Sequence, residues 1–128
     1  MKVLLDTNAL IWWFKDNPRL SAKARSFIRH PDTIVLVSSV SLWEITIKWR
    51  IGKMEFSGSS LLGQVEQAGM QLITLLPLHL YAVEGLAFHH RDPFDHLILA
   101  QAKVEGASII TSDDQMTGYG VPCIPAMR

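Results

Sequence analysis

The chain opens with a short apolar run that ends abruptly in polar residues. Val3-Leu4-Leu5 is followed directly by Asp6, Thr7 and Asn8. An unbroken apolar run of this length is typical of a strand that is buried on both faces of a parallel sheet. Side chains at the carboxyl end of such a strand reach the crevice in which open α/β sheets bind ligands. Asp6 is therefore expected either to lie in a functional site or to cap the helix that follows it.

The length and composition of the chain predict one domain without disulfides. It has 128 residues, of which 48% are hydrophobic, and a chain of this size can bury a core of its own. We therefore expect a single domain over residues 1–128. The only cysteine, Cys123, allows no internal disulfide, which fits a reducing compartment. The start of the chain does not read as a signal peptide and no segment is long enough to cross a membrane, so we expect a cytoplasmic protein.

The overall charge does not predict a polyanionic partner. Lys plus Arg and Asp plus Glu each number 12, so the formal net charge is zero. Any affinity for nucleic acid must then come from a local patch or from a bound metal. One candidate patch contains Lys48, Arg50 and Lys53, which can be interpreted as a solvated helix end or as a group that contacts phosphate.

Segments with strand and helix character alternate along the chain. The segments predicted as strands are residues 3–5, 33–37, 71–75, 108–111 and 121–124. The segments predicted as helices are residues 9–14, 22–30, about 40–52, 60–68, 78–88 and 92–105. This alternation predicts an α/β fold with a parallel sheet and helices on both of its faces.

Four acidic residues occupy positions that such a sheet would bring together. Asp6 ends the first strand and Asp113 follows the fourth by two residues, while Glu44 and Asp95 lie in predicted helices. Because parallel strands all end at one edge of the sheet, these side chains can converge there. Clustered carboxylates repel one another, and a hard cation such as Mg²⁺ or Mn²⁺ relieves that repulsion. A cation held in this way suggests metal-assisted hydrolysis of phosphodiester bonds.

Each acid also has an ordinary structural interpretation. Asp6 can cap a helix, residues 41–44 match a capping box, and Glu44 stands four residues before Lys48. Asp92 looks like an N-cap before a proline at the first helical position, and Asp113 can belong to a polar turn. The metal-site interpretation therefore depends on all four acids together.

Histidines and tryptophans are not expected to form the site. His89, His90 and His96 have no recognised zinc-binding spacing. Tryptophans can stack on nucleobases, but their helical spacing here favours positions in the core or at an interface. The tryptophans are Trp12, Trp13, Trp43 and Trp49.

Taken together, these segments resemble the PIN-domain family, and most closely its VapC-type toxin branch. The segments that carry the resemblance are 3–10 with Asp6, 37–45 with Glu44, 91–102 with Asp95, and 110–113 with the Thr-x-Asp spacing of Thr111 and Asp113. The resemblance implies a three-layer α/β/α sandwich around a parallel sheet of about five strands in the order 3-2-1-4-5. It also implies a Mg²⁺- or Mn²⁺-dependent endoribonuclease that serves as the toxin of a type II toxin–antitoxin pair.

The same resemblance implies roles for individual residues and a set of partners. The acidic quartet would bind the metal and act in catalysis, supported by hydrogen-bonding residues. The quartet is Asp6, Glu44, Asp95 and Asp113, and the supporting residues are Thr7, Asn8 and Thr111. The implied partners are an RNA substrate, a small antitoxin whose C-terminal segment occludes the active site, and a second copy of the chain in a homodimer.

Other functional classes stay open. A receiver-type phosphorylation module would need adjacent acids near the first strand, and a phosphatase with an aspartate nucleophile would need a second acid at position 8, where Asn8 stands. A non-catalytic PIN-like interaction module and a PIN nuclease outside toxin–antitoxin systems are further alternatives.

Overall fold

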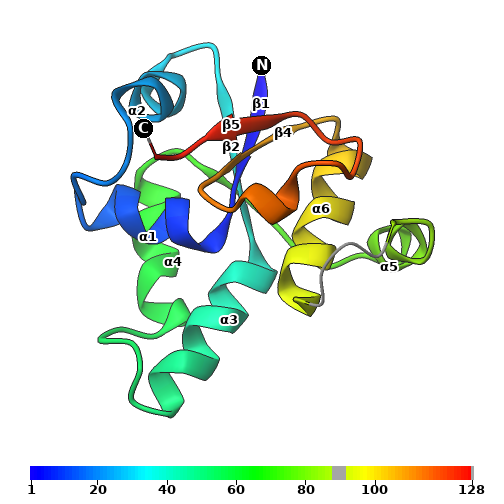
Figure 1. Cartoon of the computed structure of the whole chain (residues 1–128). Helices are drawn as coiled ribbons and strands as arrows, with labels where there is room; N and C mark the ends of the chain where they lie inside the picture. The colour runs from blue at the N-terminus through cyan, green and yellow to red at the C-terminus, as the bar shows by residue number, and fades with distance from the viewer. Residues whose placement is uncertain (88–91, 128) are drawn as a thin grey trace.

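A parallel sheet of five strands forms the centre of the structure (Figure 1). The computed structural model describes residues 1–87 and 92–127, and every statement about the fold refers to these. The strands are β1 (Lys2–Leu5), β2 (Ile34–Ser38), β3 (Gln71–Ile73), β4 (Ser108–Thr111) and β5 (Cys123–Pro125). Their order is β3-β2-β1-β4-β5 and every neighbouring pair is parallel. The predicted α/β class and strand order are thus confirmed.

Helices connect the strands and cover the sheet. They are α1 (Thr7–Phe14), α2 (Ala22–Arg29), α3 (Ser39–Arg50), α4 (Gly58–Gln67), α5 (Pro77–Glu84) and α6 (Pro93–Glu105), with a short 3₁₀ helix at Asp114–Met116. The helix predicted over 78–88 ends earlier, at Glu84, and Phe88 lies outside the described residues. Among the described residues there is no helix with the length and hydropathy that a transmembrane segment requires.

The side chains of β1 alternate between two apolar clusters. Val3 and Leu5 lie in the cluster that includes Leu10 of α1, whereas Leu4 lies in the cluster that includes Ile98 of α6. All of these side chains are fully buried. The apolar run at the start of the chain is therefore a strand covered on both faces, as expected from its composition.

α3 begins close to the predicted position, but its N-cap excludes one structural interpretation of residues 41–44. Ser38, at the end of β2, is the N-cap, and its hydroxyl accepts a hydrogen bond from the N–H of Val40 at 3.0 Å. The capping box predicted at residues 41–44 is therefore wrong, because the helix begins earlier and places Ser41 and Glu44 inside it. The Ser38 hydroxyl also donates to the side chain of Gln101 in α6, and both residues are fully buried. This contact ties the start of α3 to α6 at the carboxyl end of the sheet.

Candidate active site

A small polar cavity lies beside the carboxyl end of β1. Its volume is about 170 Å³, and the residues that line it are Asp6, Thr7, Asn8, Glu44, Lys48, Asp92, Asp95 and Asp113. All four acids that the sequence singled out are among them, although they come from the end of β1, from α3, from the first turn of α6 and from the loop after β4. Thr7 and Asn8 also line the cavity, whereas Thr111 lies beside it and is buried.

Asp6 is the most deeply buried acid of the group, with only 6% of its surface exposed. Its carboxylate accepts hydrogen bonds from the N–H of Ala9, at 2.8 Å, and from the side chain of Thr111. Asp6 therefore caps α1, as one of its two interpretations predicted, and it also lines the cavity. Burial raises the pKa of Asp6 from 3.8 to about 6; the charges of Asp113 and Glu44 add to this rise, while the two hydrogen bonds oppose it.

Glu44 is held by a group on each of its oxygens. The Thr7 hydroxyl donates to Oε1 at 2.7 Å, and Lys48 Nζ lies 3.0 Å from Oε2. The carboxylate is 12% exposed and the lysine 43%, so the pair is partly shielded from water. Ser41 Oγ lies 3.1 Å from Thr7 Oγ1 and is fully buried. The sequence interpretation missed this role of Ser41, although its position three residues before Glu44 places both on one face of a helix.

Asp92 and Asp113 each accept hydrogen bonds from backbone N–H groups a few residues further along the chain. Asp92 Oδ1 accepts hydrogen bonds from the N–H groups of Phe94, at 2.9 Å, and Asp95, at 3.3 Å, so it is the N-cap of α6. Asp113 accepts from the N–H of Gln115 at 2.9 Å and its own N–H donates to Thr111 Oγ1 at 3.0 Å. The neighbouring Asp114 is exposed and is not among the residues that line the cavity.

The chemistry of the side chains that line the cavity fits a hard divalent cation. Most are carboxylates, and the pKa of Asp6 is raised mainly by burial and further by the charges of Asp113 and Glu44. Among the described residues, however, no three His, Cys, Asp or Glu side chains come close enough to chelate one ion directly. Mg²⁺ commonly keeps several of its water ligands when it binds to a protein. Carboxylates that are too far apart to bind one ion directly can hold such an ion through these waters.

Of the basic patch predicted from the sequence, only one residue lies at the cavity. Lys48 lines the cavity, whereas Arg50 and Lys53 are exposed and do not. His89 and His90 lie outside the described residues.

The tryptophans divide into buried and exposed side chains. Trp12 is buried in the core, but Trp43 and Trp49 are 57% and 49% exposed. A core position for the last two, one of the two places expected from their spacing, is therefore wrong, because the inward face of α3 is formed by residues such as Ile45.

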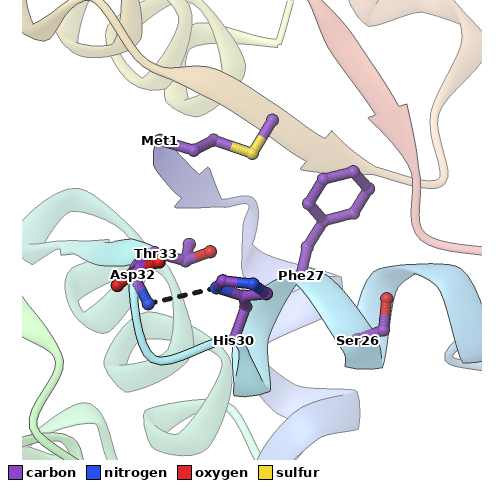
Figure 2. A pocket seen from close by; sticks show the side chains of 6 residues that line it. All are labelled: Met1, Ser26, Phe27, His30, Asp32 and Thr33. Atoms are coloured by element: carbon purple, nitrogen blue, oxygen red, sulfur yellow. Dashed lines mark hydrogen bonds between the residues drawn. The ribbon is translucent and has the colours of Figure 1, made fainter.

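A second pocket lies near the start of β1, and Figure 2 shows its lining. It has a volume of about 270 Å³ and is lined by Met1, Ser26, Phe27, His30, Asp32 and Thr33. Its hydrogen bond, drawn in Figure 2, runs from the N–H of Asp32 to Nδ1 of His30 at 3.1 Å. With a single carboxylate and an apolar wall, this pocket lacks the chemistry of the acidic cavity.

The sequence profile of the PIN domain matches residues 3–121, which is nearly the whole chain. The chain belongs to the PIN-domain family. The match includes Asp6, Glu44, Asp95 and Asp113, the four cavity acids that the sequence singled out. Compared with curated proteins by sequence, the chain has no significant match.

Solved structures share the fold of this PIN domain. A chain in the crystal structure of VapBC2 from Rickettsia felis, bound to a DNA fragment from its promoter, is similar with a TM-score of 0.74 and 17% identity, over 97% of this chain and 98% of that one. A chain of FitAcB from Neisseria gonorrhoeae has a TM-score of 0.65 and 17% identity, over 97% of each chain. A chain of a toxin–antitoxin complex from Klebsiella pneumoniae has a TM-score of 0.67 and 16% identity, over 98% of each chain. At these identities the similarity establishes the fold alone.

Proposed function

We propose that this PIN-domain chain is the toxin of a type II toxin–antitoxin pair and that it hydrolyses RNA phosphodiester bonds with Mg²⁺ or Mn²⁺. The observation that carries the proposal is the gathering of Asp6, Glu44, Asp95 and Asp113 around one cavity. Membership of the PIN-domain family supports a nuclease. The similarity to chains of toxin–antitoxin complexes supports the choice of a toxin.

The four acids would hold the cation, directly or through water, with Asp6 at the centre because the charges of both Asp113 and Glu44 act on it. When bound, the cation would supply positive charge against the phosphate and make a water molecule more acidic. The oxygen-rich lining and the charge repulsion at Asp6 support this assignment.

The protein's own side chains would orient the reaction. Thr7 would hold the Glu44 carboxylate in the position from which it accepts a proton from the attacking water. Lys48 would turn from Glu44 to the phosphate and stabilise the negative charge that develops there. Asn8, which is exposed at the cavity, would donate a hydrogen bond to the RNA backbone.

The proposal includes two protein partners. The first is a small antitoxin with a segment that covers the cavity, because one of the similar chains comes from a complex described as toxin–antitoxin. The second is another copy of this chain: because the formal net charge is zero, attraction of RNA needs a local groove of positive charge, which basic side chains from two copies would form together. Co-purification with the antitoxin and light scattering of the antitoxin-free protein test these two partners separately.

Cleavage of a structured RNA pool by antitoxin-free protein tests the activity. We expect cleavage with Mg²⁺ or Mn²⁺ that is abolished by EDTA and by Asp6→Asn. Asp32→Asn, which alters the carboxylate of the second pocket, is the matched control and is expected to stay active. Cleavage that survives both EDTA and Asp6→Asn in folded protein would refute the proposed mechanism.

A further inference from the structure

An aromatic pair joins the two helices that present Glu44 and Asp95. Trp43 of α3 and Phe94 of α6 pack with ring centroids 5.2 Å apart and an interplanar angle of 67°, in an edge-to-face arrangement. Trp43 directly precedes Glu44, and Phe94 directly precedes Asp95. Both following acids line the cavity, so each ring of the pair is one residue away from a cavity residue at the place where α3 contacts α6.

The exposure of Trp43 is not explained by packing within the chain. Phe94 is partly buried against the core, but Trp43 leaves 57% of its surface open. The edge contact restricts the orientation of the indole ring and leaves much of its surface accessible. A large flat side chain held in this way has the properties of a stacking platform.

The positive charge at the cavity matches a nucleotide chain. Lys48 follows Trp43 by five residues on α3 and lines the cavity with its cationic side chain. A phosphate near Lys48 would bring the neighbouring sugar and base toward the rim. Single-stranded nucleic acids are bound by this combination of a cationic groove and aromatic side chains on which bases stack.

We propose that Trp43 stacks on a nucleobase adjacent to the phosphate that is cleaved, and that Phe94 holds the indole ring for this contact. The inference rests on the proposed ribonuclease function, because it places the base relative to the phosphate of that reaction. It assigns Trp43 a direct contact with the substrate, whereas Trp49, six residues later on the same helix and 49% exposed, has none.

The test compares binding of two oligomers that carry the same number of phosphates. One is ten-nucleotide oligouridylate, and the other is the corresponding abasic ribose-phosphate oligomer. Binding is measured by fluorescence anisotropy in Mg²⁺ on the Asp6→Asn background, which prevents cleavage. Because the two oligomers have equal charge, the ratio of their dissociation constants reports the base contacts. Thermal unfolding of each variant verifies that the fold is intact.

We expect the background protein to prefer the base-bearing oligomer by about tenfold or more. Trp43→Ala should abolish most of this preference, and Trp43→Phe should retain much of it because a smaller ring can still stack. Trp49→Ala is the matched control and should keep the full preference. Phe94→Leu should reduce the preference, since the indole ring then loses its fixed edge contact.

Three results would overturn the inference. The first is a preference that Trp43→Ala leaves unchanged, or that Trp49→Ala reduces equally. The second is a loss of antitoxin binding by Trp43→Ala with unchanged RNA binding, which would assign Trp43 to a protein interface instead. The third is equal affinity of the background protein for both oligomers. If the wild-type chain cleaves the RNA pool while any of these holds, only the inference fails; if it does not cleave, the proposed function fails as well.

Discussion

The hydroxyl of Thr7 donates a hydrogen bond to Oε1 of Glu44 at 2.7 Å and so joins the first residue of α1 to the middle of α3. Thr7 is buried and the Glu44 carboxylate is only 12% exposed. A hydrogen bond to a partly buried charge contributes more than one between neutral groups. This contact therefore stabilises the fold and also sets the direction of an acid that lines the cavity.

Replacing Thr7 by valine tests this contact, because valine keeps the shape and removes the hydroxyl. We expect Thr7→Val to lower the free energy of unfolding by about 1–3 kcal/mol, since Glu44 loses a charge-assisted hydrogen bond. RNA cleavage should fall by at least tenfold. Thr7→Ser keeps the hydroxyl and should retain most of the activity. Equal activities of the valine and serine variants would show that the hydrogen bond has no role in the reaction.

The pKa of Asp6 predicts that this acid destabilises the metal-free fold at neutral pH. Burial raises its pKa from 3.8 to about 6, so between these values the folded protein keeps a proton that the unfolded chain has lost. Stability from this group is thus fully present below pH 3.8, falls as the pH rises, and is lost above about pH 6. This rise in the pKa of Asp6 corresponds to about 3 kcal/mol.

Asp6→Asn should therefore raise the free energy of unfolding at pH 7 by about 1–3 kcal/mol, because the amide oxygen can still accept from Ala9 without carrying a charge. At pH 4 the difference should nearly vanish. Urea unfolding at the two pH values, without divalent cations, measures both quantities. A variant that is less stable than the wild type at pH 7 would contradict the raised pKa.

Divalent cations should stabilise the folded wild-type protein and so offset the destabilising charge of Asp6. Mn²⁺ bound among the carboxylates stabilises the folded state by mass action, by about 2.7 kcal/mol at one hundred times the dissociation constant. We expect a rise in the midpoint of thermal unfolding in millimolar Mn²⁺ at pH 7, and a smaller rise at pH 5, where protons compete for Asp6. Asp32→Asn should respond like the wild type, whereas Asp6→Asn and Asp113→Asn should respond less. The absence of any shift in the wild type would argue against a metal site.

Lys48 should stabilise the metal-free protein by pairing with Glu44. Their atoms Nζ and Oε2 are 3.0 Å apart, and the pair is partly shielded from water. Because the lysine is 43% exposed, we expect Lys48→Met to lower stability by only about 1 kcal/mol. Lys15→Met is the matched control: its pair with Glu55 is more exposed, at 41% and 84%, and its loss should be nearly neutral. Urea unfolding compares the two variants, and equal effects would mean that the cavity does not strengthen the ion pair.

Asp92 lines the cavity but is expected to act as a helix cap. Because asparagine caps helices as well as aspartate, Asp92→Asn should keep both stability and cleavage, while Asp92→Ala should lower stability by about 1 kcal/mol. Asp95→Asn, three residues later on the same helix, should abolish cleavage. Loss of activity in a stable Asp92→Asn variant would instead place Asp92 among the metal ligands.

Local patterns predicted much of the fold. The apolar run before Asp6 predicted a strand buried on both faces, and the Asp92-Pro93 pair predicted the start of α6. The capping box at residues 41–44 was wrong, because Ser38 and Ser41 are both good capping residues in the sequence. The end of β2 and the buried contact with Gln101 select Ser38, and neither is visible in the local pattern.

The sequence by itself determined which segments form strands and helices and which acids stand at the ends of those segments, since both depend on neighbours within a few residues. Tertiary structure decided how the acids are held. Thr7 meets Glu44 across 37 positions of the chain, Thr111 meets Asp6 from the neighbouring strand, and Trp43 is exposed while Trp12 is buried. Hydrogen bonding, burial and pKa depend on distances between segments remote in sequence, and those distances exist only once the helices have packed on the sheet.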